Sequence, residues 1–123
     1  MSANPPKLTG IWHGYVSGTN RAPIIVRFQD GDGGVAAQAV VLDQQFGPSI
    51  LYLAGKVEGQ KAQFRLIRSI GSAPLMPLDG QITVTLNEQF TAADGIWATD
   101  LGTSGICKLL RSTEWDFRWR WRL

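Results

Sequence analysis

The stretch IIVRFQDGDGG, residues 24–34, decides the fold of this chain. Its apolar side chains Ile24, Val26 and Phe28 alternate with other residues, which is the period of a strand with one buried face. The aspartates and glycines that follow tolerate the backbone conformations of a tight hairpin turn. A half-buried strand that ends in such a turn predicts an antiparallel β-sheet.

The same alternation recurs along the chain on both sides of this stretch. It is clearest at residues 64–66, at residues 82–86, and at residues 115–123, where aromatic side chains alternate with charged ones. The runs between turn signals predict eight or nine strands, at residues 9–17, 23–30, 34–43, 49–57, 62–69, 79–87, 90–99, 104–111 and 114–122.

One segment breaks this rhythm. Residues 71–78 contain Pro74 and Pro77, which cannot donate to a sheet ladder, so we expect a longer connection or a lid there. No stretch of ten or more residues makes a convincing amphipathic helix, although residues 35–42 are apolar enough to fit either structure.

Composition agrees with a small β-protein. Hydrophobic residues make up 44% of the 123 residues and charged residues 18%, which excludes wholesale disorder, and fourteen glycines and six prolines favour many tight reversals. We therefore predict an all-β fold, an antiparallel up-and-down meander closed into a small barrel of eight or nine strands, because closure removes exposed sheet edges. A sandwich is the alternative. Residues 1–7 are expected to form a flexible N-terminal tail and residues 8–123 a single β-barrel domain.

The tripeptide Gly10-Ile11-Trp12 opens the first predicted strand. Together with the strand count, it resembles the calycin group of lipocalin, avidin and fatty-acid-binding barrels. The resemblance implies that Trp12 plugs one end of the barrel and that a basic residue from the last strand lies over its indole. The candidates for that basic residue are Arg111, Arg118, Arg120 and Arg122. Residues 95–105 are also similar to the late hairpin of small bacterial barrels.

Charge and cysteine content bear on location. The formal net charge is +2, and Cys107 is the only cysteine, so no internal disulfide and no multi-cysteine zinc site can form. The N-terminus lacks the apolar core of a secretory signal, and no apolar run is long enough to span a bilayer. These features predict a cytoplasmic protein without a membrane span.

The sequence offers few reactive groups. His13, the only histidine, is expected on the opposite strand face from Trp12 as an ordinary rim or surface residue. Cys107 is expected to be a small buried filler, since Lys108 points to the other face and cannot activate its thiolate. We predict no metal, no cofactor and no catalysis; an enzyme that uses the barrel cavity is disfavoured by this thin set of ionisable residues.

The function predicted from these patterns is non-catalytic binding of a small organic molecule in or at the mouth of the barrel. The hydroxyls of Tyr15 and Tyr52 are expected to orient it. The full set of predicted lining residues is Trp12, Tyr15, Tyr52, Phe64 and Trp97. A competing interpretation is that these aromatics only fill the core.

Two other interpretations stay open. A barrel with a filled core can serve as a protein interaction module, through a strand edge or its arginines, and can form a homo-oligomer. A nucleic acid can bind the C-terminal basic face, although in a strand the arginines point away from Trp119 and Trp121, so one surface cannot present both. That basic face consists of Arg118, Arg120 and Arg122.

Overall fold

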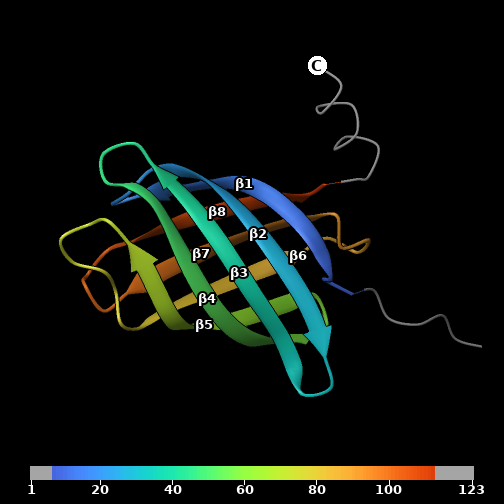
Figure 1. The fold of residues 1–123 in the computed structure, drawn as a ribbon. Coiled ribbons are helices and arrows are strands. Elements are labelled where there is room, and N and C mark those ends of the chain that lie inside the picture. The colour runs from blue at the N-terminus through green and yellow to red at the C-terminus, as the bar shows by residue number, and fades with distance from the viewer. Residues whose placement is uncertain (1–6, 113–123) are drawn as a thin grey trace, which may run out of the picture.

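The structure is a computed structural model that describes residues 7–112, which form a closed antiparallel barrel of eight strands (Figure 1). Each strand pairs with its neighbours in the chain, and β8 pairs with β1 to close the ring. The strands are β1 (Gly10–Gly18), β2 (Ala22–Gly31), β3 (Gly34–Asp43), β4 (Gly47–Glu58), β5 (Lys61–Gly71), β6 (Gly80–Leu86), β7 (Ala92–Thr99) and β8 (Ser104–Arg111). The predicted all-β barrel is confirmed, and the sandwich is wrong.

Eight strands close the ring, since β8 pairs directly with β1. Their ladder runs from Trp12 opposite Arg111 to Gly18 opposite Gly105. The predicted ninth strand at residues 114–122 lies outside the described residues, and so do the basic face and the four C-terminal aromatics expected to point inward. Lys7, the last residue of the predicted tail, is described, and its carbonyl accepts a hydrogen bond from Arg111.

The barrel interior is built by the predicted alternation. In β2, for example, the side chains of every second residue from Ala22 to Phe28 are buried and those between them are exposed. Twenty hydrophobic residues of the described chain are buried and form one cluster, while no polar or charged residue of that part is buried. The interior is therefore held together by apolar packing, which is worth about 25 cal/mol per Å² of apolar surface removed from water.

Two glycines permit the close approach of β8 to β1. A Cβ atom on Gly14 would lie 1.7 Å from the carbonyl oxygen of Lys108, and one on Gly105 would lie 1.8 Å from that of Ser17. Any side chain at these positions would push the two strands apart. Glycine at both positions thus belongs to the closure of the ring.

Up-and-down connectivity gives the barrel two different ends. The end that we call the plugged end carries residues 7–9, the turns after β2, β4 and β6, and the last residue of β8. The open end, at the left of Figure 1, carries the loops after β1, β3, β5 and β7. The longest of these four connects β5 to β6 over residues 72–79, where the prolines predicted a connection or lid; we call it the covering loop.

The barrel wall is incomplete beside the covering loop. The β4–β5 ladder continues to Gly71, but β5 pairs with β6 only over residues 61–65. The β4–β5 register shifts between Tyr52 and Leu53, which leaves Ile67 as an extra residue in β5. A bulge of this kind bends its strand. Because β6 begins only at Gly80, the residues of β5 beyond the pair of Arg65 with Gln81 have no partner in β6.

Candidate functional site

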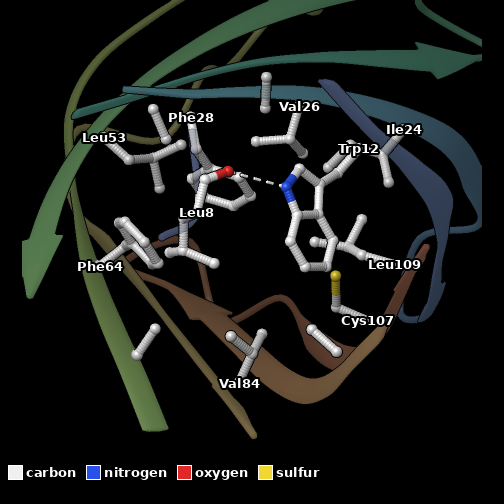
Figure 2. Packing of buried hydrophobic residues seen from close by; sticks show 14 of the residues in the cluster. Leu8, Trp12, Ile24, Val26, Phe28, Leu53, Phe64, Val84, Cys107 and Leu109 are labelled. Atoms are coloured by element: carbon white, nitrogen blue, oxygen red, sulfur yellow. Dashed lines mark hydrogen bonds between the residues drawn. The ribbon is translucent and has the colours of Figure 1, made fainter. Parts of the chain in front are cut away.

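The structure separates the five predicted lining residues into three places. Trp12 and Phe64 fill the plugged half of the barrel. The Trp12 side chain is 0% exposed, and its Nε1 donates a hydrogen bond to the Leu8 carbonyl oxygen at 3.0 Å (Figure 2). Its ring meets Phe28 edge-on at 5.8 Å between centroids, and Phe28 lies 5.3 Å from Phe64. These rings pack against one another, and neither Trp12 nor Phe64 lines the cavity at the open end described below.

Arg111 completes the plug. Its guanidinium carbon lies 5.2 Å from the centroid of the Trp12 ring, as the resemblance implied for a basic residue of the last strand. Its two terminal nitrogens donate to three backbone carbonyls, those of Phe90 at 3.0 Å, Lys7 at 2.6 Å and Thr9 at 2.7 Å. One cation therefore ties the N-terminal segment, the β6–β7 turn and β8 to the indole.

The β6–β7 turn contains a residue in the left-handed backbone conformation. Phe90 is buried although its φ is 55°, a left-handed value that side chains with a Cβ rarely adopt. The Asn87 carboxamide oxygen accepts from the backbone amides of Thr91 and Ala92, at 2.8 and 3.1 Å. The side-chain cap of Asn87 and the Arg111 contact together stabilise this turn.

Tyr15 and Tyr52 lie on the outer surface of the barrel. Tyr15 is 47% exposed, because it stands three positions after the inward Trp12 and alternation therefore turns it outward. Tyr52 lies between the inward Leu51 and Leu53, and the Arg68 guanidinium stacks 6.0 Å from its ring centroid. The prediction that these two hydroxyls orient a ligand inside the barrel is wrong.

Trp97 is the one predicted residue that lines the cavity at the open end of the barrel. This cavity, of about 300 Å³, enters the barrel from the open end and has buried core residues such as Val16 and Leu66 as its floor. The Trp97 Nε1 donates to the Ile106 carbonyl oxygen at 3.0 Å, which fixes the indole along the wall. The inward residues that shape the cavity are Val16, Ile24, Val41, Leu51, Leu53, Leu66, Ile82 and Trp97.

A few polar side chains stand at the mouth. They are Asn20, Asp43, Ser49, Ser72, Thr99 and Thr103. The Asp43 carboxylate is engaged, since it accepts from the backbone amides of Gln45 and Phe46 at 2.8 and 3.0 Å, and Thr99 and Thr103 bond to each other at 2.6 Å. Within residues 7–112, the side chains of Asn20, Ser49 and Ser72 form no hydrogen bond and are free to meet a ligand.

The covering loop closes one side of this mouth. Ala73, Met76 and Pro77 face the cavity, and the Ser69 hydroxyl donates to the Pro77 carbonyl oxygen at 2.6 Å. The Leu78 amide donates to the Asp100 carboxylate at 3.2 Å. These contacts hold the loop across the gap between β5 and β6.

An exposed ion pair ends the covering loop. Arg65 donates through Nε and Nη2 to the two carboxylate oxygens of Asp79, each at 3.1 Å. The hydrogen bond from Arg65, helped by the Gly80 amide, lowers the pKa of Asp79 below its ordinary value. Exposed pairs contribute little to stability, so this one positions the loop more than it stabilises the barrel.

A second hollow, of about 670 Å³, lies outside the plugged end. Its lining includes Lys7, Asp30, Asp32 and Glu88, and Asp30 already accepts from the amide and hydroxyl of Thr9 at 2.7 and 2.6 Å. Among residues 7–112, no three histidine, cysteine, aspartate or glutamate side chains gather closely enough to hold a metal ion. Four of the nine residues that line this larger hollow are charged, whereas the cavity at the open end is lined mainly by apolar side chains, so the cavity is the better candidate site.

The two reactive side chains lie where alternation predicted. Cys107 is buried, and burial, with the Asp94 carboxylate nearby, raises the pKa of its thiol to about 11. His13 faces outward on β1 and shares a hydrogen bond with the Ser112 hydroxyl at 2.8 Å. A buried thiol with a raised pKa is a packing residue, as predicted.

The sequence prediction missed most of the cavity. Its lining comes from ordinary aliphatic residues such as Leu51 and Leu66, from the covering loop, and from polar residues at loop boundaries. The two prolines at 74 and 77 were the available signal for the loop. Aromatic residues alone were a poor guide, because two of the five pack in the plugged half and two lie on the outer surface.

Comparison with known proteins adds no family to this description. No model of a known protein family matches the chain, and no curated protein is significantly similar to it in sequence. Residues 7–112 contain no helix with the length and apolar character that crossing a membrane requires.

Proposed function

We propose that this protein binds a small, mainly apolar organic molecule in the cavity at the open end of the barrel. The single observation that carries the proposal is an apolar hollow of about 300 Å³ that reaches buried core residues in a barrel whose other end is filled. That volume is at the lower end of the range for small-molecule sites, about 300–1,000 Å³. The ligand is therefore compact.

The lining suggests how the ligand lies. Its apolar body would pack against Leu51, Leu66 and the Trp97 ring, since removal of apolar surface from water supplies most of the affinity in such sites. One polar group would point to the mouth, where Asn20, Ser49 and Ser72 offer hydrogen bonds. This orientation leaves no polar ligand atom unpaired in the apolar floor.

The proposal is binding without chemistry. Asp43 is the one ionisable side chain among the described residues that line the cavity, and its carboxylate is held by two backbone amides. A general acid or base needs a free, suitably placed proton site. Binding alone fits these residues better.

The likeness to calycin barrels supports the proposal. Trp12 beneath Arg111 is the arrangement that this group uses to close one end, which leaves the other for a ligand. A calycin-like relationship is part of the proposal. A cytoplasmic location is also part of it, because a single cysteine without a disulfide fits a reducing compartment.

Titration with the neutral fluorescent probe N-phenylnaphthylamine tests the proposal. Leu51→Trp places a larger ring in the cavity and is expected to abolish the fluorescence increase. Ile50→Trp adds the same ring one position along β4, on the outer face, and is expected to leave it unchanged. Equal binding by both variants, or none by the wild type, would contradict the proposal. Native mass spectrometry of protein purified from its own host then identifies the retained molecule.

A further inference from the structure

Large apolar side chains surround the mouth of the cavity and point to solvent. They come from all sides of the opening, from the end of β3, the β3–β4 turn, the bulged half of β5, the covering loop and the β7–β8 turn. Leu75 and Leu78 of the covering loop are the most prominent, at 73% and 85% exposed. The full rim consists of Leu42, Phe46, Ile67, Ile70, Leu75, Leu78 and Leu101.

The covering loop has two apolar faces. Met76 and Pro77 line the cavity, Leu78 is exposed to solvent, and Leu75 is largely exposed but also borders the cavity. The loop spans the part of the wall where β5 and β6 do not pair. Apolar surface therefore continues from the rim into the cavity along this loop.

The negative charges at the rim have partners within the described part of the chain, whereas two positive charges near it have none there. The three carboxylates are engaged within the protein: Asp43 with backbone amides, Asp79 with Arg65, and Asp100 with the Leu78 amide. Arg21 and Arg68 are exposed near the same end and form no ion pair within residues 7–112. The rim thus combines exposed apolar side chains with unpaired cations.

We propose that this rim docks on the surface of a lipid bilayer and that the ligand passes between the bilayer and the cavity there. The apolar side chains stand on separate loops around an opening, so they can each enter the acyl boundary, and the arginines lie where anionic headgroups would meet them. An exposed apolar rim continuous with an apolar cavity is also suited to a ligand that is concentrated in membranes. The inference rests on the proposed function for the identity of the cargo, but docking itself does not.

Vesicle flotation tests the docking. The wild type is expected to float with phosphatidylcholine vesicles, and more strongly when they contain phosphatidylglycerol. The double variant Ile67→Ser/Leu78→Ser, whose two positions do not line the cavity, is expected to bind vesicles at least about tenfold more weakly, because two exposed apolar side chains no longer leave water. Both residues are highly exposed, so the fold tolerates the change.

A matched control uses the barrel wall. Ile11 of β1 and Leu110 of β8 are 41% and 57% exposed but lie toward the plugged end, and Ile11→Ser/Leu110→Ser is expected to bind vesicles like the wild type. Equal losses in the two double variants would overturn the proposal, as would absence of wild-type flotation, which would leave the rim to a protein partner.

Transfer of N-phenylnaphthylamine from vesicles to the protein separates this inference from the proposed function. Collisional delivery predicts a transfer rate that rises with vesicle concentration and falls in the rim variant, whereas probe binding without vesicles stays unchanged in that variant. A rate independent of vesicle concentration contradicts delivery at the rim. Failure to bind the probe without vesicles contradicts the proposed function and leaves the flotation result standing.

Discussion

The two ends of this barrel are built from the same eight strands but solve opposite problems. At the plugged end, a fully buried indole fills the interior, and one guanidinium serves three backbone carbonyls. At the open end, aliphatic side chains stop short of filling the interior, and exposed pairs such as Arg65–Asp79 hold the loops. From this difference we infer that the plugged end contributes most of the free energy of unfolding. The open end can then leave a cavity for a ligand.

Replacing one tryptophan at each end by alanine is expected to give the largest difference in stability between the two ends. Trp12→Ala is expected to lower the free energy of unfolding by about 3–5 kcal/mol, the usual cost of removing a buried aromatic ring. Trp97→Ala is expected to cost less than half of that, because the indole is only partly buried, while it weakens probe binding. Urea denaturation of both variants provides the measurement, and equal losses of stability would contradict the division.

Replacement of an arginine at each end has the next largest effect. Arg111→Met removes three hydrogen bonds from a cation and its contact with Trp12, so we expect a loss of about 2–4 kcal/mol. Arg111→Lys keeps the charge but not the fork of donors and should recover only part of this. Arg65→Met at the open end should leave the urea midpoint unchanged; a shift as large as that of Arg111→Met would show that both ends carry stability.

The pH dependence of stability above pH 9 tests the burial of Cys107, which lies in the barrel wall between the two ends. The folded pKa of its thiol is raised from 9.0 to about 11, so above pH 9 the unfolded chain ionises first. Stability is therefore complete below pH 9 and falls as the pH rises toward 11, by an amount on the order of 2 kcal/mol. Cys107→Ala should lose this part of the pH dependence, and an unchanged profile in that variant would contradict the burial of the thiol.

Acid pH has the smallest expected effect, confined to the open end. The folded pKa of Asp79 is lowered by Arg65, so its contribution is present above the ordinary value of 3.8 and is lost as the pH falls through the folded pKa. We expect faster amide hydrogen exchange in the covering loop at low pH, with no change around Trp12. Asp79→Asn should reproduce this at neutral pH, and uniform acceleration throughout the barrel would contradict a local effect.

Much of the fold was predictable because period-two alternation is a local property of the chain. The strand positions and the turn after β2 followed from neighbouring residues alone, whereas the plug at Trp12 was implied by the resemblance to calycin barrels. The same rule also excludes Tyr15 from the face of Trp12, since three positions separate them, so that error was avoidable.

The site was less predictable because it depends on relations between distant residues. Trp12 and Trp97 both point inward, but which end of the barrel each occupies depends on the register of strands at opposite ends of the sequence. The bulge at Ile67 is a register shift between β4 and β5, and β5 pairs with β6 over only part of its length. Neither feature can be predicted from the local sequence pattern.

Closure of the ring by its first and last strands has a consequence for folding. Arg111 contacts the Lys7 carbonyl across 104 positions of the chain, so ring closure joins residues that are very far apart in sequence. During synthesis on the ribosome, β1 has an unsatisfied edge until β8 has emerged. We expect slow maturation and, before it is complete, a need for chaperone protection that the finished barrel no longer has.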